Sequence, residues 1–118
     1  MWQEKRQSKR ITLSLPIDYT VLDTIEKEFS STICKNISEG GLKVVFRRFF
    51  PPKTKFLLKI NLMGINKIIE TMAESAWSFN IHYANTYYSG LRFQDLNSPN
   101  RKLLNEYLVM KEITKSTH

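Results

Sequence analysis

Apolar residues recur at every second position over two long stretches, and this alternation limits the possible folds more than any other feature of the sequence. The first stretch carries Ile11, Leu13, Leu15, Ile17, Tyr19 and Val21, and the second carries Phe56, Leu58, Ile60 and Leu62. A period of two is that of a β-strand with one buried face. The alternation therefore predicts a mainly β protein. Pro16 falls on the polar face of the first stretch and predicts a sheet edge or a bulge there.

Four further runs have strand character, and short polar turns separate them. We expect six strands at 11–21, 29–37, 42–46, 56–62, 67–79 and 87–93. Consecutive antiparallel strands with short connections favour a closed barrel, because closure removes exposed sheet edges. In the fifth strand, Trp77 and Phe79 occupy alternating positions, so we expect both in the core.

The last part of the chain changes to a helical pattern. Ser98 is a candidate helix cap and Pro99 suits the first turn. An apolar stripe at helical spacing follows, formed by Leu103, Leu104, Tyr107 and Leu108. This stripe predicts a C-terminal helix packed against the barrel. We divide the chain into a flexible basic arm (1–10), a barrel with its helix (11–112) and a frayed tail (113–118).

The segment from Lys35 to Leu42 reads as a hairpin with a Gly-bearing, bulged turn. Asn36 and Ser38 stand two residues apart, and on a regular strand they project to the same face. An amide beside a hydroxyl donates and accepts together, which suits the edge of a nucleobase. Gly41 would let a flat ligand approach the backbone, and either glycine can take positive φ. The alternative is an ordinary β-turn, because Asn, Ser and Gly are common turn residues.

A second motif precedes the first strand, where Arg6 and Arg10 stand four residues apart. Arg-x-x-x-Arg followed by Asn-x-Ser-x-x-Gly resembles the pattern of the PilZ family. The resemblance runs from about Lys5 to the final helix and includes Ser-Leu-Pro-Ile (14–17), Ala-Trp (76–77) and Gly-Leu-Arg-Phe (90–93). It implies a six-stranded antiparallel β-barrel of PilZ type with a C-terminal α-helix. It also implies a receptor for the bacterial second messenger cyclic di-GMP.

The resemblance assigns a role to each motif residue. Arg6 and Arg10 would clamp phosphate and guanine, Asn36 and Ser38 would hold a guanine, and Gly41 would permit its close approach. Asn36 replaces the commoner Asp, which the pattern allows, although a neutral amide makes weaker hydrogen bonds than a carboxylate. Peripheral contacts are expected from Lys5, Gly40 and Arg92, with a cationic rim around the hairpin formed by Lys35, Lys43, Arg47 and Arg48.

Composition restricts which partners, disulfides, metal sites and cellular locations we expect. A net charge of +7 indicates an anionic partner. The single cysteine, Cys34, excludes an intramolecular disulfide and is interpreted as a packing residue. His82 and His118 lack partners at metal-ligand spacing, and no nucleophile–base arrangement stands out, so we expect no metal, no cofactor and no enzyme activity. The N-terminus is too polar for a signal peptide, and no apolar run approaches the ~20 residues of a membrane span, which predicts a cytoplasmic protein without membrane insertion.

Two alternatives to the receptor remain open. One is a PilZ-type adaptor that binds an effector protein and does not respond to nucleotide. The other is a small barrel that binds nucleic acid, which the charge of +7 favours. We favour it less than the receptor, because most aromatic residues fall at inward-facing positions instead of forming an exposed stacking surface. The exception is the run Arg47-Arg48-Phe49-Phe50. An effector protein partner is expected for the receptor as well.

Overall fold

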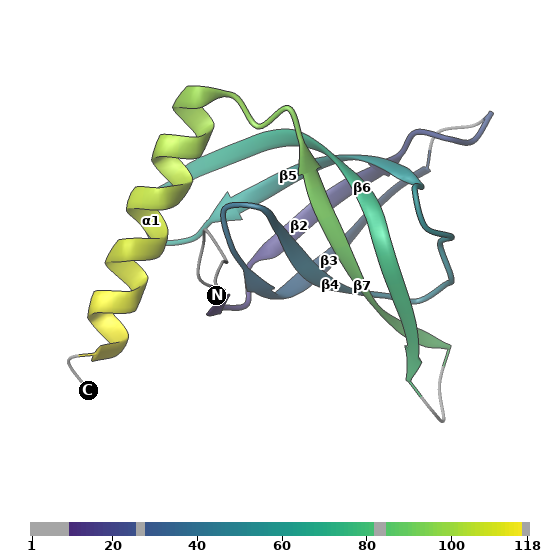
Figure 1. Ribbon diagram of the computed structural model, residues 1–118, viewed down its shortest axis with the longest axis horizontal. Helices are drawn as coiled ribbons and strands as arrows, with labels where there is room; N and C mark the ends of the chain where they lie inside the picture. The colour runs from purple at the N-terminus through teal and green to yellow at the C-terminus, as the bar shows by residue number, and fades with distance from the viewer. Residues whose placement is uncertain (1–9, 26–27, 82–84, 117–118) are drawn as a thin grey trace, which may run out of the picture.

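The computed structural model describes residues 10–25, 28–81 and 85–116, with side chains described up to residue 113. The elements are β1 (Ile11–Thr12), β2 (Pro16–Val21), β3 (Glu28–Ile37), β4 (Gly41–Phe46), β5 (Lys55–Leu62), β6 (Lys67–Ile81), β7 (Thr86–Gln94) and α1 (Ser98–Ser116). Every strand pairing is antiparallel, and the sheet closes in the order β3–β2–β5–β6–β7–β4 and back to β3 (Figure 1). The predicted six-stranded barrel is confirmed.

The first predicted strand is present in two pieces. β1 and β2 both pair with β3, and residues 13–15 between them leave the strand geometry just before Pro16. Proline has no N–H for the ladder, so a strand begins at it more readily than it runs through it. The interruption predicted at Pro16 is therefore present, and β1 becomes a short separate element that pairs beside the hairpin.

Alternating side chains fill the barrel as the sequence predicts for β5, whose four inward residues are fully buried. Four rings form the centre of the core, from Tyr19, Phe46, Phe50 and Phe56, with neighbouring centroids 4.7 to 6.4 Å apart. Most of these pairs meet edge to face, the arrangement that ring quadrupoles favour. The barrel interior is thus a packed aromatic core.

The helix α1 lies at one side of the barrel in Figure 1 and buries Leu104, Tyr107 and Leu108. The Tyr107 hydroxyl donates a hydrogen bond to the Met63 carbonyl oxygen at 2.7 Å, which joins the helix to the turn between β5 and β6. The capping residue is Asn97: its Oδ1 accepts the backbone N–H of Asn100 at 2.9 Å. The cap predicted at Ser98 is wrong by one residue, because α1 already includes Ser98.

Two bulges interrupt the alternation that the sequence predicts. One leaves Lys35 as an extra residue in β3, and the other leaves Ala76 as an extra residue in β6. An extra residue reverses which side chains face inward beyond it. In β6, Ser75 is buried, yet Trp77 and Phe79 are 43% and 64% exposed. The prediction that Trp77 and Phe79 belong to the core is therefore wrong.

Among the described residues, no helix is both long enough and apolar enough to cross a membrane.

Candidate functional site

The tip of the β3–β4 hairpin is a tight turn organised by Ser38. Its backbone N–H donates to the Gly41 carbonyl oxygen at 2.9 Å, and its hydroxyl accepts the Gly40 N–H at 3.2 Å. Ser38 is 5% exposed and lies one residue beyond the end of β3. Because Ser38 lies in the turn beyond the end of β3, the strand alternation that would place Ser38 and Asn36 on one face does not apply. The Ser38 hydroxyl thus has a structural role in the turn, and its contact with a ligand remains a prediction.

Gly41 is required by the neighbouring strand. A Cβ atom built there would lie 2.1 Å from the carbonyl oxygen of Leu91 on β7. Gly64 has the only positive φ among the glycines, so Gly40 and Gly41 do not use the left-handed region. Gly41 thus permits the close approach of β7, and the expected approach of a ligand at Gly41 remains a prediction.

The tip of the hairpin is held from two further sides. The Phe93 N–H on β7 donates to the Gly40 carbonyl oxygen at 2.9 Å. The Arg101 guanidinium of α1 lies 3.3 Å from the Glu39 carboxylate and also donates to the Leu96 carbonyl oxygen at 3.2 Å. The turn is therefore fixed between the last strand and the start of the helix, so the residues beside it have a defined orientation.

The two sequence motifs meet at Arg10 and Asn36. The short strand β1 pairs with the end of β3, with Thr12 opposite Asn36, and this pairing brings the N-terminal segment to the hairpin. Arg10 Nη1 donates to Asn36 Oδ1 at 2.6 Å in an exposed position. Lys5 and Arg6 lie outside the described residues. The contact places a guanidinium directly beside the amide of the second motif.

A row of outward-facing residues continues from Asn36 across the barrel. Asn36 is opposite Lys43 on β4, Lys43 is opposite Gly90 on β7, and Gly90 is opposite Trp77 on β6. At about 4.8 Å per strand, the row spans roughly 14 Å. The Lys43 ammonium lies 4.3 Å from the ring centroid of Tyr88. An amide, a cation and an aromatic ring thus share one exposed face.

Trp77 is the residue of this face that sequence reasoning missed. Its indole lies over Gly90, where a Cβ atom would come within 2.2 Å of Nε1. The bulge at Ala76 turns the side chain outward. A glycine within a strand often marks a close approach, so Gly90 was the available signal.

The predicted cationic rim is only partly assembled. Lys35 is exposed at the bulge of β3, and Arg92 is exposed on β7 opposite Gly41. Arg47 and Arg48 follow the far end of β4 from the hairpin tip, and Arg48 pairs with Glu28 at 2.7 Å. The expectation that these two arginines surround the hairpin is therefore wrong, because β4 runs the length of the barrel and carries them to its other end.

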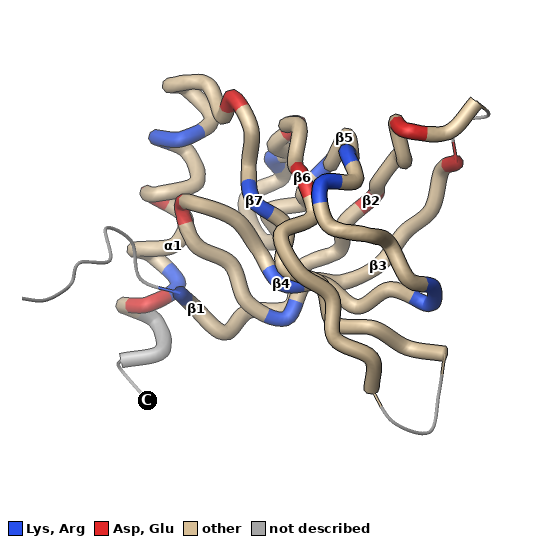
Figure 2. The backbone as a smooth tube through the Cα atoms, turned by 45° about the vertical axis from the view of Figure 1, so that its right-hand side comes forward, with Lys and Arg blue, Asp and Glu red and all other residues tan. Residues whose placement is uncertain are grey.

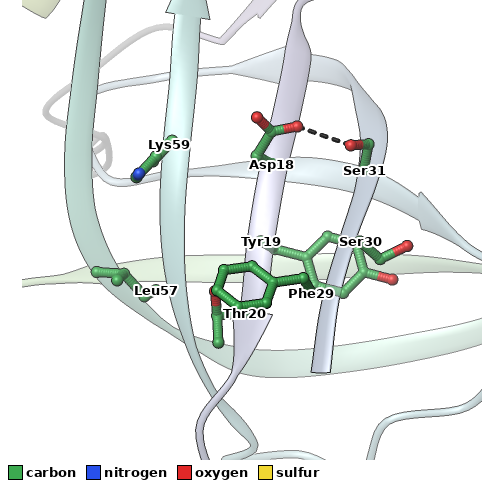
Figure 3. Close-up of a pocket in the computed structure, with 8 residues that line it drawn as sticks. All are labelled: Asp18, Tyr19, Thr20, Phe29, Ser30, Ser31, Leu57 and Lys59. Atoms are coloured by element: carbon green, nitrogen blue, oxygen red, sulfur yellow. Dashed lines mark hydrogen bonds between the residues drawn. The ribbon is translucent and has the colours of Figure 1, made fainter. Parts of the chain in front are cut away.

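A separate hollow of about 390 Å³ lies over β2, β3 and β5 and does not include Arg10 or Asn36. Figure 3 shows its lining, in which the Ser31 hydroxyl donates to the Asp18 carboxylate at 2.7 Å and Lys59 lies on the next strand. Arg10 and Asn36 instead lie on the outer surface of the barrel.

The chemistry of the described residues favours binding. None of the described His, Cys, Asp and Glu residues gather in threes that would hold a metal ion. Burial raises the pKa of the Cys34 thiol above its ordinary value, so the thiol stays protonated and is a poor nucleophile. The arrangement on the outer face offers hydrogen bonds, positive charge and an exposed ring, which together suit an anionic aromatic ligand.

Comparison with known proteins agrees with this fold. The family model described as the PilZ domain matches residues 4–109. The structure is similar to the Bacillus subtilis inhibitor of motility MotI/DgrA, with a TM-score of 0.79, 23% sequence identity and coverage of 96% of this chain and 53% of that chain. It is also similar to Escherichia coli YcgR in complex with c-di-GMP, with a TM-score of 0.78, 14% identity and coverage of 97% and 49%. The PilZ domain of YcgR with c-di-GMP gives a TM-score of 0.71, 16% identity and coverage of 96% and 95%.

At these identities the structural likeness concerns the fold. This chain spans about half the length of the first two of these proteins. No curated protein matches the sequence closely enough to count as a relative.

Proposed function

We propose that this chain, which belongs to the PilZ domain family, is a receptor that binds cyclic di-GMP and relays the signal to an effector protein. The ligand would lie on the outer face of the barrel, between the arm that carries Arg6 and Arg10 and the row that begins at Asn36. Binding would be the whole of its chemistry, without catalysis and without a cofactor.

The observation that carries the proposal is the 2.6 Å contact between Arg10 Nη1 and Asn36 Oδ1. It joins the two motifs, which are separated by 26 residues in the sequence. A guanidinium pairs bidentately with phosphate or with the O6 and N7 atoms of guanine. The Asn36 carbonyl oxygen has two lone pairs, so it can accept from Arg10 and from a guanine N–H together. The two groups therefore suit adjacent parts of one guanine nucleotide.

The rest of the row suits the second half of the ligand. Cyclic di-GMP carries two guanines and two phosphates, and Lys43 supplies positive charge in the middle of the row. The exposed indole of Trp77 offers a stacking surface for a purine. The turn residues Ser38 and Gly41 would act by holding the hairpin in position, and direct contacts from them remain part of the proposal.

Single-stranded nucleic acid is a second candidate ligand, because Trp77 and Phe79 are exposed on the same face as Lys43. Aromatic rings interleaved with cations are typical of sequence-tolerant binding to single strands. The net charge of +7 also favours binding to the phosphates of a nucleic acid. What favours the cyclic dinucleotide is the family and the meeting of its two motifs.

Calorimetric titration of the wild type with cyclic di-GMP, GTP and a short single-stranded oligonucleotide distinguishes these ligands. We expect saturable binding of cyclic di-GMP and little of GTP, whose single guanine cannot engage the arm and the hairpin together. Oligonucleotide binding would fall steeply with salt, because each phosphate contact releases counterions. An absence of heat with cyclic di-GMP up to millimolar concentration would refute the receptor and leave the nucleotide-independent adaptor.

A further inference from the structure

The outer face of the barrel carries a second row of side chains beside the one that begins at Asn36, and this row is apolar. On β7 and β6, Tyr88 is directly opposite Phe79, and on β4 Val45 is directly opposite Tyr88. On β3, the Thr32 hydroxyl donates to the Val45 carbonyl oxygen, which places the neighbouring Ile33 beside Val45. Ile33, Val45, Tyr88 and Phe79, here called the apolar strip, thus cross four strands in sequence.

The strip is accessible. Ile33 is 44% exposed and Phe79 is 64% exposed, while Val45 and Tyr88 are half-buried between them. Ile33 and Val45 also line a hollow of about 690 Å³ at this end of β3 and β4. Apolar side chains that are exposed in a contiguous group, and not singly, mark an interaction surface.

Cations flank the strip on β3 and β4. Lys43 has its ammonium over the Tyr88 ring. Lys35 and Arg47 line the same hollow as Ile33 and Val45, where the carboxylate of Glu28 is paired with Arg48. Figure 2 shows blue Lys and Arg stretches beside the β4 label and no red stretch next to them. The surface that covers this strip is therefore expected to be apolar at its centre and acidic at its edges.

The dimensions of the strip indicate the shape of its occupant. Four strands at about 4.8 Å spacing give a strip roughly 14 Å long that runs across the strands. An α-helix rises 1.5 Å per residue, so about ten residues cover this length, with apolar side chains recurring at i, i+3 or i+4, and i+7. A helix laid across the strands would place its apolar face along the strip.

We propose that the apolar strip is the docking site for an acidic amphipathic helix of an effector protein. The inference rests on the proposed function in that it names the surface through which the receptor reaches its effector. Lys43 belongs to the first row and its ammonium lies over Tyr88 of the apolar strip, so a ligand held at Asn36, Lys43 and Trp77 would lie against the edge of the docked helix. Signal relay would then be a direct coupling between adjacent sites, mediated by the positive charge that they share.

The test uses a fluorescein-labelled peptide of about 18 residues, long enough to be partly helical alone, with leucines at i, i+3, i+4 and i+7 and glutamates elsewhere. Fluorescence anisotropy should show saturable binding to the wild type that weakens with added salt. We expect Phe79→Ser to weaken it at least about tenfold, since Phe79 is the most exposed aromatic anchor of the strip and truncating such an anchor has effects of this size. Arg47→Gln should weaken it less, through the lost charge.

The chain offers a matched control in Val109, which is 55% exposed on α1 and far from the strip in sequence. Val109→Ser should leave peptide binding unchanged. Equal weakening by Val109→Ser and Phe79→Ser would overturn the proposal, as would equal binding of a shuffled peptide of the same composition or of a peptide with lysine in place of glutamate. Circular dichroism melting of both variants excludes unfolding as the cause.

Other occupants of the strip give different results. A dimer in sedimentation velocity that Phe79→Ser abolishes would assign the strip to a second copy of this chain and overturn the proposal. Displacement of the peptide by a single-stranded oligonucleotide, at a concentration below that of the peptide, would assign the strip to nucleic acid and would also overturn the proposal. Calorimetry with cyclic di-GMP is performed on the same samples. Peptide binding without nucleotide binding refutes the receptor alone, and nucleotide binding without peptide binding refutes the docking site alone.

Discussion

Replacing Gly41 with alanine should destabilise the protein strongly, although the change adds a single methyl group to a surface hairpin. The new Cβ atom would lie 2.1 Å from the Leu91 carbonyl oxygen, 3.1 Å from its carbon and 3.2 Å from the Arg92 Cα. Relaxed contacts between heavy atoms lie near ~3.5–4.0 Å, so β4 and β7 must separate by about 1 Å or more. All three atoms belong to backbone, which cannot rotate away as a side chain can.

The magnitude follows from two costs. Overpacking a close contact costs about 1–3 kcal/mol. Separation of the strands also weakens neighbouring backbone hydrogen bonds, such as the one from Phe93 N–H to the Gly40 carbonyl oxygen, at about 0.5–1.5 kcal/mol each. The free energy of unfolding should therefore fall by about 2–4 kcal/mol. At roughly 4 °C per kcal/mol for a domain near this size, Tm should fall by about 8–16 °C.

Gly40→Ala is the matched control, since it alters the adjacent glycine of the same turn. A Cβ atom at Gly40 would meet only the Ser38 Oγ, at the ordinary distance of 3.9 Å. We expect its Tm to stay within a few degrees of the wild type, because the substitution fits the space and the backbone conformation. Thermal and urea unfolding, followed by far-ultraviolet circular dichroism without ligand, measure both variants. If Gly41→Ala melts together with Gly40→Ala, the steric explanation of this glycine is refuted.

Three further predictions concern the binding face and the core. Arg10→Ala should weaken cyclic di-GMP binding more than tenfold in calorimetry, since a charge-assisted contact is worth about 1.5–3 kcal/mol, while Tm stays unchanged and the charge control Lys59→Ala binds normally. Gly90→Ala should displace the Trp77 indole, which would change tryptophan emission and reduce cyclic di-GMP affinity with little loss of stability; an unaltered spectrum and affinity would exclude the close contact. Burial raises the pKa of the Cys34 thiol above its ordinary value, so the folded state holds its proton more tightly than the unfolded state does. The stabilisation from that thiol is complete below the ordinary pKa of a cysteine and is lost as the pH rises from there through the raised pKa of the folded state. Urea unfolding at increasing alkaline pH should therefore show a smaller decline in the free energy of unfolding for Cys34→Ala than for the wild type.

The strand pattern and the two motifs could be predicted from the sequence, because each is a pattern of residues that lie close together along the chain. In β5, Phe56 and Leu58 alternate with polar residues over an unbroken strand, and the structure buries them as expected. Leu104 and Tyr107 stand at helical spacing, and α1 places both against the barrel. A helix or strand repeats its geometry locally, so its buried face can be read from the order of residues alone.

Which residues lie on the outer face was decided by contacts between distant strands. The bulge at Ala76 exists only relative to β7, and it turns Trp77 and Phe79 outward where alternation alone predicts them inside. Gly41 likewise depends on Leu91, fifty positions along the chain. A sequence carries the period of each strand, whereas the extra residue of a bulge and the close approach of two backbones arise when the barrel closes. Closure therefore positioned Asn36, the cations and the exposed rings on one face.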